Sequence, residues 1–272
     1  MALISETAKR VRKWIVDATS EAASGHPSTS LSAVELACVL YFGDVLRYKP
    51  DQPDWPDRDR FILSKGHAAP MLYAVLAEAG YFPTDQLLTL RKFGSPLEGH
   101  PNMKRLPGVE ASTGSLGQGL SIGIGHALAA RIDGKGYRTY VMQGDGETQE
   151  GQTWEAAMFA GNHGIDNLTL VLDRNRYQQS GATDDISSLD PLPDKFSAFG
   201  WEVTEIDGHA IDEVGKAYDW ARGVKDKPQV VIANTVKGRG VAYLEAEGNY
   251  HGKALPKDKL PYAHREIERG LQ

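Results

Sequence analysis

The sequence predicts an α/β fold in which helices cover both faces of a parallel sheet. Short apolar runs alternate with stretches of helical periodicity along most of the 272 residues, which is typical of strand–helix–strand units. Polar turns rich in Gly, Asp, Asn and His follow several of the apolar runs, as expected where parallel strands end beside a ligand. The composition, with 41% hydrophobic and 24% charged residues, suits one large globular domain or two small ones.

Two helices are predicted in the N-terminal part of the chain. Residues 6–23 place apolar side chains on one face at helical spacing, and Ser5 is positioned to cap the first turn. A second helix is expected over residues 31–46, where Ser32 and Glu35 have the spacing of a capping box.

The rest of the chain alternates between predicted strands and helices. The expected strands cover residues 61–63, 137–142, 168–172, 202–206 and 230–233. The expected helices cover residues 68–79, 116–132, 154–161 and 211–222. Residues 48–60, rich in Pro and Asp, are expected to be a loop, and the polar tail from about 255 to 272 is expected to wrap the surface.

Charge and composition exclude several classes of protein. The net charge is −6 and no basic run is present, whereas a nucleic-acid binder needs clustered Lys and Arg. No stretch approaches the roughly 20 apolar residues that cross a bilayer, and the N-terminus lacks the apolar core of a signal peptide. The one cysteine, Cys38, lies in an apolar run and is expected to be a buried hydrophobe. We therefore expect a cytoplasmic protein.

Polar residues at the ends of two predicted strands have the chemistry of a magnesium site. Asp145 lies in the turn 144–146 after one strand, and Asn175 follows the next strand. Magnesium prefers such oxygen ligands and takes the rest from phosphate and water. The alternative for Asp145 is a capping residue in a tight turn. Because the turns 207–209 and 234–235 also follow strands, we expect all four turns to form one crevice.

A glycine-rich segment, residues 112–119, precedes an apolar helix. Glycines at the start of a helix allow a ligand or another backbone to approach closely. The segment does not match the dinucleotide fingerprint, because no clear strand precedes it and the glycine spacing differs. Gly119, Gly123 and Gly125 also predict tight packing of the helix on its neighbour, so we expect the loop to serve the ligand and the helix to serve packing.

Four of the eight histidines lie in glycine-containing turns, namely His26, His67, His100 and His251. A single histidine is more often structural than catalytic, but four in similar turns predict a polar pocket. Such a pocket can hydrogen-bond a polyhydroxylated substrate and move protons near neutral pH. The four histidines lack the short spacing of a zinc site.

Three glutamates, Glu147, Glu150 and Glu155, closely follow the turn that carries Asp145. Spacing alone favours an acidic helix N-terminus, which the helix dipole stabilises. The alternative is that Glu150 or Glu155 shares protons with a carboxylate of a partner chain.

Taken together, these segments resemble the transketolase family. The matching segments are 24–27, 64–68, 99–101, 113–119, 144–147, 150–151, 175, 207–209 and 251–252, and they occur in the family's order. The Gly-Asp-Gly turn is shared by thiamine diphosphate enzymes in general, whereas the histidine turns are specific to transketolases. The resemblance implies that residues 1–272 are a single thiamine diphosphate-binding domain, with the tail on its surface.

The resemblance implies thiamine diphosphate as cofactor, with Mg²⁺ or Ca²⁺. The ion would be held by the side chains of Asp145 and Asn175 and by the backbone carbonyl of Tyr177. The implied cofactor-binding residues are Gly114, Ser115, Leu116, Asp145, Gly146, Glu147, Asn175, His67 and His251.

The implied chemistry is transfer of a two-carbon ketol unit from a ketose to an aldose. The resemblance places His67 and His251 beside the diphosphate and the reactive centre. It places His26 and His100 against substrate hydroxyls. Glu150 and Glu155 correspond to carboxylates that link paired active sites across a dimer.

The resemblance covers only the diphosphate-binding domain, because a full-length transketolase is more than twice this long. We therefore expect the N-terminal subunit of a split transketolase, with a partner chain that supplies the pyrimidine-binding domain in an α2β2 heterotetramer. Two other functions are open: an α-subunit of a 2-oxo acid dehydrogenase, and a non-catalytic subunit that only binds cofactor.

One departure from the family pattern lies near the expected metal site. The chain has Ser180–Gly181 where the family usually has Asp-Gly. Because this carboxylate is missing, the family's usual local hydrogen bonding and its donor preference are not assumed for this chain. The family's phosphate-binding arginines lie largely outside this domain, so a phosphate and a sulfonate on the substrate are equally compatible with the sequence.

Overall fold

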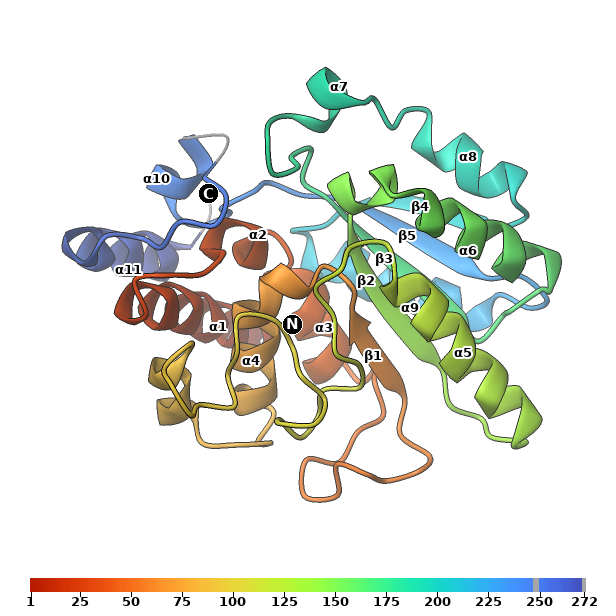
Figure 1. The fold of residues 1–272 in the computed structure, drawn as a ribbon, viewed down its shortest axis with the longest axis horizontal. Coiled ribbons are helices and arrows are strands. Elements are labelled where there is room, and N and C mark those ends of the chain that lie inside the picture. Colours follow the sequence, from red (N-terminus) through yellow and green to blue (C-terminus); the bar gives the residue numbers. More distant parts are fainter. Residues whose placement is uncertain (247–249, 271–272) are drawn as a thin grey trace.

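A computed structural model describes residues 1–246 and 250–270, and Figure 1 shows its central sheet. The strands are β1 (Arg60–Leu63), β2 (Thr139–Gly144), β3 (Leu168–Arg174), β4 (Glu202–Asp207) and β5 (Gln229–Asn234). All of them pair in parallel, in the order β1-β2-β3-β5-β4. The predicted parallel sheet is confirmed, and every predicted strand is present.

Alternate side chains along the strands enter two separate hydrophobic cores. Ile62 and Val141 contribute to one core, whereas their neighbours Phe61 and Tyr140 contribute to the other. This division follows from the twofold side-chain alternation of a strand when both faces of a sheet are covered.

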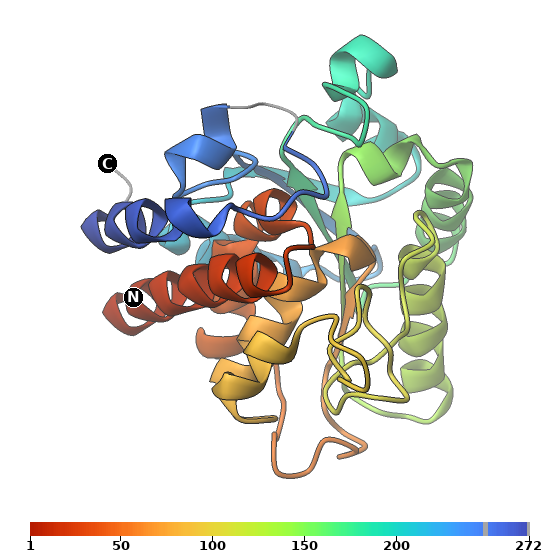
Figure 2. The same ribbon diagram turned by 60° about the vertical axis from the view of Figure 1, so that its left-hand side comes forward.

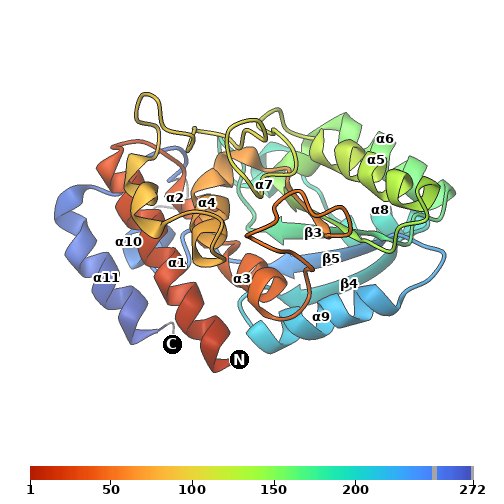
Figure 3. The same ribbon diagram turned by 90° about the horizontal axis from the view of Figure 1, so that it is seen from below.

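Helices cover both faces of the sheet, as predicted. One face carries α5 (Gly119–Ile132), α6 (Gly151–Asn162) and α8 (Leu192–Ala198). The other layer contains α1 (Ala2–Glu21), α3 (Val34–Phe42), α4 (Ala69–Glu78) and α9 (Ile211–Gly223). Figure 3 separates the two layers, with α5 and α6 on the opposite side of the sheet from α9.

Shorter elements connect this framework. The helices are α2 (Pro27–Leu31), α7 (Thr183–Ile186), α10 (Ala242–Ala246) and α11 (Leu260–Arg269). Short 3-10 helices are η1 (Gly66–Ala68), η2 (Thr84–Thr89), η3 (Gly146–Gln149) and η4 (Lys257–Lys259). No helix in the described ranges combines the length and apolar composition needed to cross a membrane.

The predicted helix over residues 31–46 is interrupted and shorter. It divides into α2 and α3, and the predicted capping box is wrong. Ser32 donates a hydrogen bond to the carboxylate of Asp173 at 2.6 Å, and Glu35 forms an ion pair with Arg12. Two buried polar contacts with distant residues therefore replace the local cap. Cys38 lies within α3 and is fully buried, as predicted.

The ends of the chain differ from the predictions in two ways. The helix α1 begins at Ala2, so Ser5 lies within its first turn and does not cap it. The tail is not merely a surface-wrapping segment, because most of it forms α11. Ala263 and Ile267 are buried, and α11 packs beside α1, as Figure 2 shows.

Glycines in α5 set the distance between this helix and the sheet. A Cβ atom on Gly119 would lie 2.2 Å from Oγ of Ser64, and one on Gly123 would lie 2.3 Å from a methyl carbon of Val141. Tight packing at these two positions is confirmed. The same prediction for Gly125 is wrong, because a Cβ atom there would meet nothing within 4 Å.

Candidate active site at the carboxyl ends of the strands

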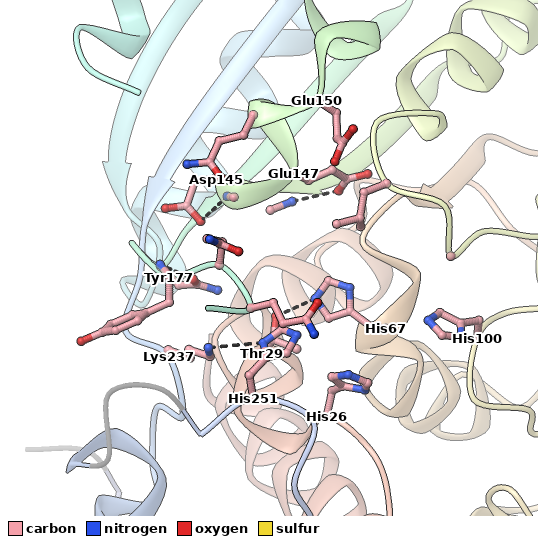
Figure 4. Close-up of a pocket in the computed structure, with 18 residues that line it drawn as sticks. His26, Thr29, His67, His100, Asp145, Glu147, Glu150, Tyr177, Lys237 and His251 are labelled. Atoms are coloured by element: carbon pink, nitrogen blue, oxygen red, sulfur yellow. Dashed lines mark hydrogen bonds between the residues drawn. The ribbon is translucent and has the colours of Figure 1, made fainter. Parts of the chain in front are cut away.

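A cavity of about 360 Å³ lies at the carboxyl ends of β2 and β3, and we call it the central cavity (Figure 4). Asp145 enters it after β2, Asn175 after β3 and Lys237 after β5. The predicted turn 207–209 is not part of this cavity, because His209 lines a separate cavity. Asn234 and Thr235, which form the predicted turn after β5, do not line the central cavity either, although Lys237 beyond them does. The prediction of one crevice is therefore correct for the turns after β2 and β3 but wrong for residues 207–209 and 234–235.

The carboxylate of Asp145 is almost completely buried. Its Oδ1 accepts a hydrogen bond from the Gly146 amide at 2.9 Å, and its Oδ2 accepts one from the Arg176 amide at 2.7 Å. Burial and the nearby charge of Asp173 raise the pKa of Asp145 to about 7, although these amides and Lys65 act in the opposite direction. A cation bound here would supply the positive charge that the ionised carboxylate lacks.

Asn175 is held in a definite orientation beside Asp145. Its amide nitrogen faces the acceptors Ser32 Oγ at 3.3 Å and Asp173 Oδ2 at 3.4 Å, so its amide oxygen is directed away from them. Tyr177 also lines the central cavity. No cluster of three His, Cys, Asp or Glu that could hold a metal ion occurs in the described ranges. Asp145 and Asn175 offer one carboxylate and one side-chain amide to the cavity, and oxygen ligands of this kind are those that Mg²⁺ binds together with phosphate and water.

Close backbone packing shapes the walls of the central cavity. A Cβ atom on Gly146 would lie 2.6 Å from Cβ of Gln178, so glycine lets the Asp145 turn lie directly on the loop that follows Asn175. Gly114 has φ of +151°, and a Cβ atom there would lie 3.0 Å from the His100 ring. These glycines let Gln178 and the His100 ring pack directly against the backbone that lines the cavity.

The four predicted histidines all line the central cavity. The rings of His26, His67 and His251 form a triangle with centroid separations of 5.3, 5.0 and 5.3 Å. His100 stands apart, beside the glycine-rich loop, as Figure 4 shows. The turns that carry these histidines are far apart in sequence, so the tertiary fold creates the polar pocket that was predicted.

Burial keeps these imidazoles neutral. It lowers the pKa of His26 to about 4 and that of His251 to about 3, with further lowering from Arg91 near His26 and from Lys237 near His251. Burial also lowers the pKa of His67 well below its usual value, and Lys65 contributes. Neutral imidazoles can donate one hydrogen bond and accept another, or accept a proton.

Lys237 and Thr29 are site residues that the sequence analysis missed. Nζ of Lys237 lies 3.4 Å from Nδ1 of His251, and Oγ1 of Thr29 lies 3.5 Å from Nε2 of His67. Burial and the charge of Lys65 lower the pKa of Lys237 to about 8, although Asp145 and Asp173 raise it. The position of Lys237 three residues after Asn234, the last residue of β5, was the available signal.

A buried ion pair connects several of the elements that surround the site. Lys65, after β1, contacts the carboxylate of Asp173 in β3 and donates to the carbonyl of Thr29 at 3.0 Å. Thr235 donates to the same carboxylate. This network connects the ends of β1 and β5 to β3 and α2, and Thr29 of α2 contacts His67.

The glutamates after the Asp145 turn have different environments. The Glu147 carboxylate is buried and accepts hydrogen bonds from Ser64 and from the amides of Gly117 at 2.9 Å and Gly144 at 3.2 Å. These hydrogen bonds hold the segment just before α5 against the turn that follows β2. Glu150 is exposed at the rim of the central cavity, whereas Glu155 is exposed on α6 and does not line it.

Ser115 and Ser180 lie outside the central cavity. Gly114 and Leu116 line it, but Ser115 between them is exposed and accepts a hydrogen bond from Gln118 at 3.0 Å. Ser180 is also exposed, in the turn between Tyr177 and Ala182, and does not line the cavity.

Comparison with known proteins identifies the family of this chain. Residues 4–268 match the family described as transketolase, thiamine diphosphate binding domain. The chain is 42% identical to the 6-deoxy-6-sulfo-D-fructose transketolase subunit SqwG of Clostridium sp. (strain MSTE9), and the match covers 98% of this chain and 96% of that protein. It is 39% identical to one of the subunits of the apulose-4-phosphate transketolase of Phocaeicola vulgatus, over 96% of this chain and 92% of that one.

Longer transketolases match over part of their length. The chain is 43% identical to the transketolase of Homo sapiens, but it spans only 42% of that protein. The crystal structure of the transketolase of Campylobacter jejuni superposes with a TM-score of 0.92 at 32% identity, over 98% of this chain and 43% of that one. The chain therefore belongs to the transketolase family, whose N-terminal, thiamine diphosphate-binding domain it contains.

Proposed function

We propose that this chain is the N-terminal subunit of a two-chain transketolase that transfers a two-carbon ketol unit from a ketose donor to an aldose acceptor. The observation that carries the proposal is the triangle of neutral imidazoles in the same cavity as Asp145 and Asn175. Near-complete coverage of two relatives that are named as subunits supports the two-chain form.

Asp145, Asn175 and the carbonyl of Tyr177 would hold a divalent cation, Mg²⁺ or Ca²⁺, that binds the cofactor's diphosphate. Lys237 and His67 provide hydrogen-bond donors to the same anion. Gly114, Leu116 and Gly146 leave backbone surface for the cofactor. Bound thiamine diphosphate supplies the carbon nucleophile and the electron sink for cleavage and formation of carbon–carbon bonds.

The histidines would bind and orient the sugar. His26 and His100 lie on the side of the cavity away from Asp145 (Figure 4), where they can hydrogen-bond substrate hydroxyls. His251, between Lys237 and the other imidazoles, is placed to accept a proton from a substrate hydroxyl and to return it. Such positioned proton transfer contributes about 10²–10⁴-fold in enzymes.

The partner would carry the pyrimidine-binding domain, in an α2β2 assembly. Glu150, at the rim of the cavity, and Glu155, exposed on the helix that follows it, would then face another chain. The names of the two relatives that are subunits specify a sulfonated and a phosphorylated sugar, respectively. We accordingly propose a sugar bearing a terminal anionic group as the substrate class.

The test is to coexpress this chain with a candidate partner chain and to assay ketol transfer from a ketose phosphate or ketose sulfonate. Activity should require both chains, thiamine diphosphate and Mg²⁺. Decarboxylation of a 2-oxo acid without ketol transfer would instead indicate the dehydrogenase function. Cofactor binding without either reaction, in a complex with an otherwise competent partner, would indicate a non-catalytic subunit.

A further inference from the structure

Outside the central cavity, a buried ion pair of Arg12 and Glu35 contacts His209, whose side chain is 10% exposed, and we call these three residues the buried triad. Arg12 binds Glu35 through two nitrogens, at 2.6 and 2.8 Å, and Nδ1 of His209 lies 3.0 Å from the same carboxylate. All three side chains line a second cavity, and none lines the central one. Burial opposes ionisation of Glu35, but Arg12 and His209 outweigh it and lower its pKa to about 2.

The contacts of His209 determine its tautomer. The amide of Val236 donates to Nε2 of His209 at 2.8 Å, so Nε2 must be the unprotonated nitrogen. Nδ1 therefore carries the proton and donates it to Glu35. The ring connects a buried carboxylate to one particular backbone amide, just as an oriented imidazole does at many functional sites.

The buried triad holds the loop that carries Lys237 on both sides of this residue. His209 accepts from Val236 on one side, and Arg12 donates to the carbonyl of Arg239 at 3.1 Å on the other. Between them, the Gly238 amide donates to the carbonyl of Ser28 at 2.8 Å. These bonds fix the backbone from which the buried Lys237 side chain enters the central cavity.

We propose that the buried triad is a positioning device that holds Lys237 in place for the diphosphate of the cofactor. His209 is its central positioning residue, since it is the member whose side chain both accepts from the Lys237 loop and donates to Glu35. The inference rests on the proposed function only for the identity of the anion. The hydrogen bonds that hold the loop are independent of it.

The test compares His209→Leu, which removes both contacts, with His209→Gln, which retains an acceptor for the Val236 amide. In the assembled enzyme, His209→Leu should accelerate hydrogen exchange of Val236 at least about tenfold and weaken thiamine diphosphate binding in Mg²⁺ about tenfold, the change expected for loss of one buried hydrogen bond. His209→Gln should retain most of the exchange protection and affinity. His264→Leu is the matched control, because it removes a histidine–carboxylate contact of 2.7 Å between α11 and α1 whose two residues line neither cavity, and it should change neither measurement.

A double-mutant cycle with Lys237→Met separates positioning from general destabilisation. If His209 acts through Lys237, the double variant should bind thiamine diphosphate no more weakly than Lys237→Met alone. Multiplication of the two losses would overturn the proposal. Unchanged hydrogen exchange of Val236 in His209→Leu would also overturn it. Failure of the wild-type enzyme to bind thiamine diphosphate would instead refute the proposed function, and the exchange measurement does not depend on that result.

Discussion

Asp145 is a buried carboxylate whose hydrogen bonds, among the residues that the structure describes, come from two backbone amides. Lys65 acts on this carboxylate but does not offset burial and the charge of Asp173, so its pKa is still raised. The adjacent Asn175 and Tyr177 supply neutral oxygens, so a further positive group is needed to compensate the charge. At the residue scale, this imbalance is the strongest physical argument for a divalent cation in the site.

Asp145→Ala should abolish metal-dependent retention of the cofactor in the assembled enzyme. Loss of even an outer-shell partner of a metal site costs about 10–100-fold in affinity, so loss of a direct ligand should cost more than about 100-fold. The measurement is titration of thiamine diphosphate with and without Mg²⁺. Asp212→Ala, on the exposed face of α9, is the control, and an unchanged affinity in Asp145→Ala would refute the metal assignment.

His251→Ala should lower kcat more than it lowers cofactor affinity. The ring contacts His26, His67 and Lys237, so its removal eliminates a proton acceptor and leaves Asp145 and Asn175 unchanged. We expect kcat to fall by about 10²–10⁴-fold. Steady-state kinetics measure kcat, and titration with thiamine diphosphate measures cofactor affinity. Equal losses of kcat and of cofactor affinity would contradict a role of His251 in proton transfer.

At the scale of elements, the packing of α5 on the sheet places the glycine-rich loop at the rim of the central cavity. Gly119 and Gly123 permit this approach, and Glu147 ties the loop to the turn after β2. A change that displaces α5 from the sheet would therefore also displace the glycine-rich loop from the rim of the cavity.

Gly123→Ala should destabilise the protein, because the new methyl group would overlap with Val141. Overpacking of this kind costs about 1–3 kcal/mol. Gly125→Ala in the same helix is the matched control: it has open space and should stabilise the protein by up to about 1 kcal/mol through helix propensity. Denaturant unfolding measures both, and equal effects would contradict the packing argument.

At the scale of the whole molecule, the histidine pocket links folding to pH. In the folded chain the pKa values of His26 and His251 lie at about 4 and about 3, below the ordinary value of 6.5. Between these values the unfolded chain binds more protons than the folded chain, so the free energy of unfolding falls as pH decreases.

The cofactor-free protein should therefore lose stability progressively as pH falls from about 6.5 towards 4. Urea unfolding at several pH values measures the effect. The variant His26→Asn should show a smaller pH dependence, whereas His163→Asn, at an exposed position, should match the wild type. Equal slopes in His26→Asn and the wild type would show that other groups control the acid sensitivity.

Much of the fold was predictable because its signals are local. Apolar runs and helical periodicity indicated each strand and the long helices. The glycine-containing turns indicated Asp145 and the four histidines as site residues, and the position after a strand indicated Asn175. The predictions failed where a distant partner replaces a local one. Ser32 and Glu35 have the spacing of a capping box, but they bind Asp173 and Arg12 instead.

The sequence alone determined the class of fold and the chemical groups of the site, because side-chain periodicity and turn composition act over a few residues. Only the tertiary structure decided which groups share a cavity. It directs Lys237 towards His251, commits Glu147 to internal hydrogen bonds and pairs His209 with Glu35, 174 positions away in the sequence. Such pairings depend on how helices pack across the sheet, and this packing leaves no trace in the local spacing of the residues it brings together.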